Sequence, residues 1–377
     1  MHRIPLYRPY LTGSELDYVK EVFANRRLSG DGPFTQKCQT LLEEALGVPK
    51  VMLTTSCTHA LEIAALLLGI QPGDEAIIPS FTFVSTVNAF VLRGARPVFA
   101  DIRPDTLNLD EKRLENLITE RTKVIVPVHY MGVACEMDAI MEIAQKHKIA
   151  VIEDNAHGLF ARYKNRSLGA IGCMSALSFH ETKNFICGEG GALLLNDPRW
   201  IGAAEIIREK GTNRCQFVRG EVDRYTWVAL GSSYLPSDLL AACLYAQLQM
   251  REKIQERRAR MWRFYYENLQ EWAESIGAQL PAVPPYCEQA YHQFYFLMPT
   301  PEQRRALIAH LKSQDIESAF HYLPLHLSDM GRRYGGREGD CPVTEDICYR
   351  LIRIPFYYGL SEAEQSRVVE EIVRFDA

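Results

Sequence analysis

The sequence predicts an α/β protein, with a mostly parallel β-sheet covered by helices on both faces and a smaller α+β unit after it. Three observations support this prediction. Short apolar runs alternate with segments of helical spacing through the first half of the chain, which is typical of parallel strands joined by helices. The chain has 377 residues, 47% of them hydrophobic, so it can bury a large core. A long charged helical stretch then leads to a region of mixed strand and helix patterns.

The elements of the first half follow one another in the order that a parallel sheet requires. Residues 51–54 form a short apolar run, and residues 58–68 then have helical spacing. A strand that is covered on both faces is apolar throughout, so other short apolar runs are strand candidates. These candidates are residues 75–78, 97–101, 123–129 and 150–153, with a helix predicted at residues 137–148 between the last two.

The pattern changes near residue 175. Two β-like runs, residues 175–179 and 192–196, flank a loop that contains the glycine cluster GEGG at residues 188–191. We expect the parallel order of the strands to break there. The glycine cluster by itself indicates no more than a tight turn.

A second unit is predicted from the C-terminal part of the chain. Residues 239–260 form a long helical stretch that carries many charges after Gln249 and connects the two units. Residues 277–300 are rich in proline and aromatic residues and end in a predicted strand, and residues 302–313 have helical spacing. We place the boundary between residues 250 and 251, which gives a large domain of residues 1–250 and a small α+β domain of residues 251–377.

Composition and charge exclude several classes of protein. The net charge is -5 and the pI is about 6.1, with no basic block, so a nucleic-acid partner is not expected. The ten cysteines include no CxxC pair, which favours reduced core thiols over a disulfide framework or a zinc site. The N-terminus lacks the apolar region of a signal peptide, and apolar runs such as residues 60–70 are too short to span a bilayer. We therefore expect a soluble cytoplasmic protein.

Polar and aromatic residues gather at the carboxyl ends of the predicted strands. Ligands of open α/β sheets bind at this edge, so the segments directly after the strands are the candidates for a site. These segments are residues 55–58, 79–83, 129–130, 154–157 and 180–183. Together they supply a helix start that can hold an anion, an aromatic face, a carboxylate and a lysine.

This set of groups suits pyridoxal phosphate. That cofactor needs a lysine amine for covalent attachment and a carboxylate that keeps its pyridine nitrogen protonated. It also needs a cradle for its phosphate, which a helix N-terminus provides, and an apolar wall against its ring. The residues that meet these needs are Lys183, Asp154, the turn at residues 56–58 and Phe83, while His157 and Ser178 can add hydrogen bonds.

Each of these residues also has an ordinary interpretation. Asp154 follows a strand, where an aspartate is often a helix cap. Phe83 is of a type that is usually core, and a single lysine such as Lys183 is usually a solvated surface residue. Only the occurrence of suitable residues at all five strand ends together supports a cofactor site. Periodicity and spacing alone therefore indicate an α/β enzyme and leave the cofactor open.

Ordered motifs along nearly the whole chain resemble the DegT/StrS family of sugar-nucleotide aminotransferases. The motifs are SCTHAL (56–61), PSFTFVST (79–86), VHYMG (128–132), VIEDNAHG (151–158), SFHETKN (178–184), GEGGALL (188–194), REKG (208–211) and HYLPLH (321–326). The family belongs to the fold-type I pyridoxal-phosphate enzymes. The resemblance therefore implies a large domain with a seven-stranded, mostly parallel sheet and a smaller C-terminal domain.

The resemblance also implies a role for individual residues. It makes Lys183 the Schiff-base lysine and Asp154 the partner of the pyridine nitrogen. It assigns His157 to the ring hydroxyl and Phe83 to stacking on the ring. The residues that it assigns to the phosphate are Cys57, Thr58 and Ser178.

The family's sites borrow a residue from the neighbouring subunit, so the resemblance implies at least a homodimer. Many members carry Asn-Tyr-Arg in the segment that reaches the partner's phosphate. This chain has Ser233, Tyr234 and Leu235 there. A shorter hydroxyl replaces the amide and the arginine is missing, so we keep Ser233 as the cofactor contact on this segment.

The reaction implied by the resemblance is amino transfer from L-glutamate to a keto-sugar nucleotide. Within the family the closest likeness implies amination at C4 of dTDP-4-keto-6-deoxyglucose, with a UDP-4-keto or a dTDP-3-keto sugar as the alternative. The candidate substrate contacts are Lys210, Arg214, His321, Tyr322 and His326. His321 and His326 have a second interpretation, in which they only line the interface between the domains.

Two other functions share features with this sequence. Members that act as 3-dehydratases have a histidine in place of the lysine, so Lys183 argues against that chemistry. A non-catalytic sensor that binds the cofactor or a nucleotide sugar is compatible with the same residues, and only a turnover assay separates it from an enzyme.

Overall fold

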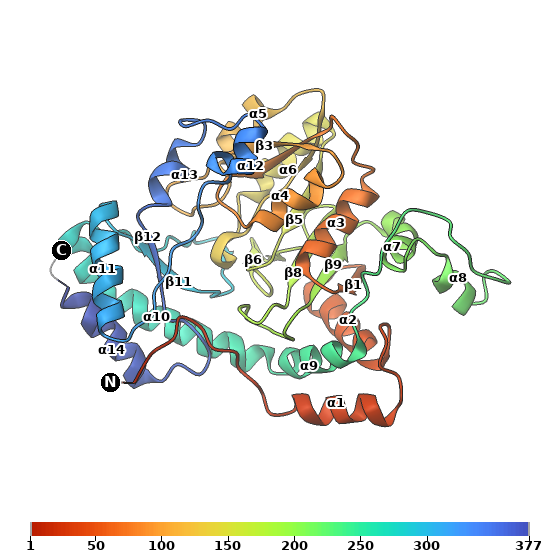
Figure 1. Ribbon diagram of the computed structural model, residues 1–377, viewed down its shortest axis with the longest axis horizontal. Coiled ribbons are helices and arrows are strands. Elements are labelled where there is room, and N and C mark those ends of the chain that lie inside the picture. The colour runs from red at the N-terminus through yellow and green to blue at the C-terminus, as the bar shows by residue number, and fades with distance from the viewer. Residues whose placement is uncertain (1, 376–377) are drawn as a thin grey trace.

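The computed structural model describes residues 2–375, in which a central β-sheet lies between two layers of helices beside a smaller second unit (Figure 1). The central sheet has seven strands in the order β1-β9-β8-β5-β4-β2-β3. The strands are β1 (Lys50–Thr54), β2 (Glu75–Pro79), β3 (Arg96–Ala100), β4 (Thr122–Ile125), β5 (Ala150–Asp154), β8 (Met174–Ser178) and β9 (Gly191–Leu195). The prediction of an α/β fold is confirmed.

The strand directions confirm a mostly parallel sheet. The pairs from β3 through β2, β4 and β5 to β8 are all parallel. β9 is antiparallel to both of its neighbours, β8 and β1. The parallel order therefore breaks at β9, directly after the GEGG loop, where the sequence pattern changes.

One strand is shorter than its sequence pattern predicts. The apolar run 123–129 gives only β4, and Val128 then makes a single bridge to Asp154. Pro127 has no N–H to donate to a ladder, so regular pairing ends before it. The remaining strands of the central sheet end within about two residues of their predicted ends.

Alternate side chains of the strands pack against different helices. Met52 belongs to an apolar cluster with α3 (Cys57–Leu67), α4 (Val84–Val91) and α7 (Ile201–Arg208) on one face. Val51 and Leu53 belong to a cluster with α2 (Pro33–Leu46) and α9 (Asp238–Gln249) on the other face. α6 (Met137–His147) covers the rest of that second face against Ile77, Ile125 and Val151. Burial on both faces explains why these strands are apolar throughout.

Shorter elements surround this core. They are α1 (Glu15–Ala24), α5 (Leu114–Leu117), α8 (Arg214–Val218) and a three-stranded sheet of β6 (Arg162–Tyr163), β7 (Arg166–Ser167) and β10 (Cys287–Glu288). In Figure 1, α8 and the loop that follows it extend away from the body of the molecule.

The second unit is built on two antiparallel strands, β11 (Phe294–Leu297) and β12 (Leu351–Ile354). Helices pack on them around one apolar cluster. The helices of this unit are α10 (Arg251–Ile276), α11 (Pro301–Ser313), α12 (Asp329–Arg333), α13 (Pro342–Ile347) and α14 (Glu362–Val373). This arrangement has the α+β composition that the sequence predicts.

The helical stretch at residues 239–260 consists of two helices, because α9 ends at Gln249 and α10 begins at Arg251. This break falls where we place the domain boundary, which remains a proposal. The start of the chain crosses that boundary. Ile4 is fully buried in the cluster of the second unit and bridges to Ile316.

Within residues 2–375, none of the helices combines the length and the apolar character that crossing a membrane requires.

Candidate active site

The carboxyl ends of the central strands open into one cavity of about 660 Å³. The second unit closes it from the opposite side through residues around β11 and β12. Most of the residues predicted from the sequence line this cavity. They are Cys57, Thr58, Phe83, Asp154, His157, Ser178, Lys183, His321 and Tyr322.

Four predicted residues lie outside the lining of this cavity. Ser233 bridges to Glu209 on the segment beside α7, and the amine of Lys210 pairs with Glu209 at 2.8 Å. Arg214 is the first residue of α8. The roles that we predict for these three residues remain predictions.

His326 is the fourth of these residues, and it has no free ring nitrogen. Its Nδ1 lies 2.6 Å from Ser80 Oγ and its Nε2 lies 2.9 Å from Glu345 Oε1, and the side chain is fully buried. Because Ser80 follows β2, this contact fastens the second unit to the edge of the sheet. The position differs from the predicted substrate contact and matches the alternative of an interface residue.

The start of α3 forms a candidate anion-binding site in the cavity. Ser56 caps the helix, and its side chain accepts a hydrogen bond from the amide of His59 at 3.1 Å. The amides of Cys57 and Thr58 have no acceptor within reach among residues 2–375. Free amides at a helix N-terminus attract phosphate through their N–H groups and the helix dipole.

Asp154 is the last residue of β5 and only 5% exposed. Thr86 Oγ1 donates to its Oδ2 at 2.7 Å, and the amide of Ala156 donates to its Oδ1 at 3.2 Å. These two bonds fix the plane of the carboxylate at the cavity wall.

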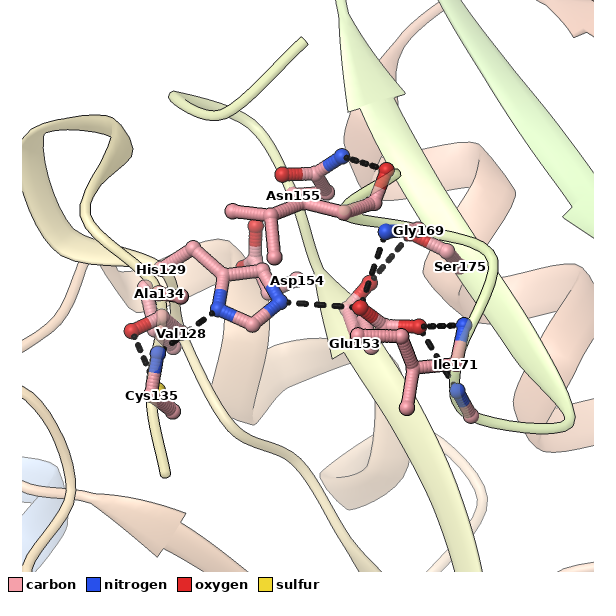
Figure 2. A network of polar contacts seen from close by, with 12 residues as sticks. Val128, His129, Ala134, Cys135, Glu153, Asp154, Asn155, Gly169, Ile171 and Ser175 are labelled. Carbon is pink, nitrogen blue, oxygen red and sulfur yellow. Dashed lines mark hydrogen bonds and ion pairs between the residues drawn. The ribbon is translucent and has the colours of Figure 1, made fainter. Parts of the chain in front are cut away.

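The preceding residue, Glu153, belongs to a different network (Figure 2). Its carboxylate accepts from the amides of Gly169, Ile171 and Gly172 at 2.7–2.8 Å and lies 2.9 Å from Nε2 of His129. Burial works against its charge, but the hydrogen bonds from His129 and from the amides lower the pKa of Glu153. Successive strand residues point to opposite faces, so Glu153 points away from the cavity that Asp154 faces.

The ring of His129 has one assignable tautomer. The amide of Cys135 donates to Nδ1 at 3.2 Å, so that nitrogen carries no proton. Nε2 is then protonated and donates to Glu153. Figure 2 shows this chain of contacts from Cys135 through His129 to Glu153.

Lys183 lies in the loop after β8, and its own amide donates to the carbonyl of His180 at 2.9 Å. Burial lowers the pKa of Lys183 to about 8, although Cys57 and Asp154 act in the opposite direction, and the charge of Arg353 lowers it further. An amine with this pKa is neutral part of the time near neutral pH, and the neutral form is the nucleophile.

Histidine and aromatic rings form the far wall. His157 stacks on His292 with centroids 4.2 Å apart, and the amide of Met131 donates to Nδ1 of His157 at 3.3 Å. His321 stacks on Tyr322 at 3.8 Å. Burial lowers the pKa of all three imidazoles well below their usual range, so they are neutral at neutral pH.

Phe83 is 57% exposed at the cavity, and its nearest aromatic neighbour is Tyr322, with ring centroids 6.4 Å apart. A large apolar ring left open in this way offers a surface for a flat ligand ring.

Sequence reasoning missed several residues of the lining. His292, Gln293 and Arg353 reach the cavity from β11, β12 and the residues beside them, and Thr86 reaches it from α4. Thr86 is the last residue of the PSFTFVST motif, and its spacing from Phe83 along a helix start is a usable signal. The other three carry no local signal, because the folding of the second unit brings them to the site.

The residues present fit pyridoxal phosphate. The cavity combines an amine whose pKa is lowered, an oriented carboxylate and two unpaired helix amides. It also has the open face of Phe83 for the ring. These are the groups that the cofactor requires for attachment, ring protonation, phosphate binding and stacking.

Comparison with known proteins identifies the family of this chain. The model of the DegT/DnrJ/EryC1/StrS aminotransferase family matches residues 9–373. The spore coat polysaccharide biosynthesis protein SpsC of Bacillus subtilis is 32% identical, over 98% of this chain and 96% of that protein. GDP-perosamine synthase of Escherichia coli O157:H7 is 31% identical, over 100% of this chain and 99% of that enzyme.

A solved structure has the same fold. The PLP form of the putative sugar aminotransferase Spr1654 from Streptococcus pneumoniae matches with a TM-score of 0.90 and 26% identity, over 98% of each chain. The family model covers nearly the whole chain, including every residue of the cavity named above. The chain belongs to the DegT/DnrJ/EryC1/StrS aminotransferase family and is an aminotransferase.

Proposed function

We propose that this aminotransferase moves an amino group from L-glutamate to C4 of dTDP-4-keto-6-deoxyglucose, which gives dTDP-4-amino-4,6-dideoxygalactose for a surface polysaccharide such as enterobacterial common antigen. The cofactor is pyridoxal phosphate. The observation that carries the proposal is that Lys183, Asp154 and the free amides at the start of α3 face one cavity. The sugar is chosen because the chain resembles the transaminase that makes this product along most of its length.

The residues of the site have distinct roles. Bound pyridoxal phosphate supplies an electron sink for the negative charge that develops when a proton leaves the donor. Nζ of Lys183 would hold the cofactor, and the free amine would accept the proton from Cα of the donor and deliver it to the cofactor. The carboxylate of Asp154 would keep the ring nitrogen protonated, and the amides of Cys57 and Thr58 would bind the phosphate.

The environment of Lys183 suits both of its tasks. A lysine that attaches a cofactor and also moves a proton must change its charge during the reaction. A pKa of about 8, set mainly by burial, makes both forms accessible near neutral pH. A lysine with its usual pKa would be almost entirely protonated and unable to attack.

A homodimer is the proposed assembly, and one surface supports it. The segment from α8 to residue 230 extends from the body of the molecule (Figure 1) and exposes large apolar side chains. These exposed residues are Phe217, Val218, Tyr225, Trp227, Val228 and Leu230. Several large apolar side chains exposed on one short segment are typical of a protein interface. We propose that this segment packs on a second copy, and that Ser233, which follows the segment in the chain, completes the phosphate site of that copy.

The experiment is a comparison of acceptors. Pyridoxamine-loaded enzyme is given dTDP-4-keto-6-deoxyglucose, a UDP-4-keto sugar, a GDP-4-keto sugar and a dTDP-3-keto sugar, and each product is identified by NMR. We expect the highest kcat/KM with the first of these acceptors. In its product the new amine at C4 should be axial, which is the galactose configuration. Preference for another nucleotide or for C3 would contradict the substrate and leave the aminotransferase chemistry intact.

A further inference from the structure

Asn184 directly follows Lys183, and its side chain bonds to a segment that lies more than 100 residues further along the chain. Its Nδ2 donates to the carbonyl of Ala290 at 2.7 Å, and its Oδ1 lies 2.8 Å from Nδ1 of His292. A carbonyl can only accept, so the amide group of Asn184 has one assignable orientation, with Oδ1 towards His292. Asn184 thereby joins the lysine loop to the residues before β11.

This contact decides the tautomer of His292. An amide oxygen only accepts, so Nδ1 of His292 carries a proton and donates it. Burial lowers the pKa of His292 well below its usual range, which makes the ring neutral. None of the other groups that act on this pKa is an anion; they are His157, Lys183, Arg258 and His321. The neutral ring therefore keeps a free lone pair on Nε2.

The neighbouring ring, His157, has the opposite tautomer. The amide of Met131 donates to its Nδ1, so the proton of this neutral ring is on Nε2. The rings of His157 and His292 stack with their planes 19° apart, and both residues line the cavity. Neither Nε2 has a hydrogen-bond partner among residues 2–375. The stacked pair thus has one N–H and one lone pair left for a bound molecule.

The backbone of His292 is held independently of its ring. Arg258 on α10 donates through Nε to the carbonyl of Tyr291 at 2.9 Å and through Nη2 to the carbonyl of His292. Its guanidinium also lies over the ring of Phe356. These contacts keep the segment in place, but they do not determine which ring nitrogen carries the proton. A change at Asn184 should therefore alter the ring of His292 without releasing the segment.

We propose that Asn184 is a positioning residue of the active site, which acts through His292 so that the stacked imidazoles present one donor and one acceptor to a hydroxyl group, an inference that rests on the pyridoxal-phosphate site of the proposed function. A hydroxyl both donates and accepts, so it fits such a pair. The ring hydroxyl of the cofactor and the hydroxyls of the sugar share this chemistry. With its proton on Nε2, His292 would be a second donor, and the hydroxyl would lose its acceptor.

The direct test is the protonation of the imidazole nitrogens in the apo-enzyme. The protein is labelled with 15N-histidine, and the ring signals of His292 are identified by their absence from His292→Gln. NMR of the wild type should show the proton on Nδ1. Asn184→Leu, which is close to asparagine in shape but has no oxygen, should show a ring that exchanges between both tautomers. A proton on Nε2 in the wild type, or an unchanged ring in Asn184→Leu, would overturn the proposal.

Asn184→Asp separates positioning from a structural role. The carboxylate still accepts from Nδ1, but its charge raises the pKa of His292, so the ring becomes doubly protonated as pH falls. Turnover should approach that of wild type at about pH 9, where Nε2 is free, and fall towards about pH 6. Asn184→Leu should lose roughly 10-fold in kcat/KM at every pH, the effect of one hydrogen bond. Parallel pH profiles for the two variants would indicate a structural role only and contradict the proposal.

Two affinities identify the hydroxyl concerned. Weaker binding of pyridoxal phosphate to apo Asn184→Leu, with an unchanged KM for the keto-sugar nucleotide, indicates the ring hydroxyl, and the converse indicates a hydroxyl of the sugar. Asn268→Leu is the matched control, because this exposed asparagine donates to the carbonyl of Phe264 on its own helix. It should behave as the wild type does in each measurement. Unchanged affinities for both ligands in Asn184→Leu would overturn the proposal.

The outcomes also distinguish this inference from the proposed function, because the NMR experiment and the cofactor titration need no sugar. A wild-type enzyme that has the Nδ1 proton on His292, and whose cofactor affinity depends on Asn184, can still fail to aminate the proposed sugar. That result would contradict the proposed function and support the role of Asn184.

Discussion

Gly191, the first residue of β9, lies directly against the start of α3, so that a Cβ at this position would collide with the backbone nitrogen of Cys57 and the carbonyl of Ser56. The glycine cluster by itself indicates only a turn. In the structure its last glycine also lets the antiparallel strand β9 pass beside the start of α3, whose free amides face the cavity.

Gly191→Ala should therefore weaken cofactor binding. The backbone at Cys57 has to move away, and the loss of one or two charge-assisted bonds to phosphate corresponds to roughly 10- to 100-fold in the dissociation constant. Titration of apo-enzyme with pyridoxal phosphate, followed by fluorescence, measures it. Gly202→Ala is the control, because nothing lies within 4 Å of a Cβ there. Equal affinities for the two variants would contradict the role of Gly191.

Asp154→Asn should retain the cofactor and lose most of the activity. The amide can still accept from Thr86, but it does not hold a proton on the ring nitrogen, and the electron sink weakens. We expect kcat to fall by about 10²–10³-fold, the size of comparable electrostatic effects in other sites. Single-turnover kinetics with glutamate measure the loss. Asp138→Asn removes an exposed carboxylate paired with Lys164 and Arg166 and should react normally. A near-normal rate in Asp154→Asn would show that its carboxylate is not needed.

Much of this site follows from the sequence, because strand and helix periodicity places Asp154 and Lys183 at the same edge of the sheet. The sequence does not decide which of the neighbouring carboxylates, Glu153 or Asp154, faces the cavity. In the structure the loop at residues 169–172 encloses Glu153 and leaves Asp154 at the cavity. Arg353 and His292 were missed because their positions depend on how the second unit packs against the sheet. That packing is a property of long-range contacts, which local patterns do not encode.

Glu153→Gln should destabilise the fold in a pH-dependent way. At pH 7 the amide cannot accept from all four donors, and a buried donor left unpaired costs about 1–3 kcal/mol, so we expect a loss of roughly 2–5 kcal/mol. The pKa of Glu153 is lowered in the folded protein, so its contribution is full above the usual carboxyl range and is lost as pH falls through the folded pKa. Urea unfolding at pH 7 and at about pH 4 should therefore show a difference from wild type that narrows in acid.

The control for this variant is Glu115→Gln, which changes a surface carboxylate near Lys146 and His147. It should leave stability nearly unchanged at both pH values. A constant difference between Glu153→Gln and wild type across this range would mean that the charge of Glu153 does not contribute to folding.

Lys183 should be the only lysine that carries the cofactor, and its attachment should depend on pH. Only the neutral amine attacks, so the rate of attachment to apo-enzyme should rise with pH and level off above about 8, where burial sets the pKa. Borohydride reduction of the loaded enzyme, followed by peptide mass spectrometry, should place the cofactor mass on the peptide that contains Lys183.

Lys183→Ala should fold and bind the cofactor without a covalent bond, and it should not turn over. Lys164→Ala changes an exposed lysine near Asp138 and should behave as the wild type. Label on another lysine, or an attachment rate that does not change between pH 6 and about 9, would contradict the assignment.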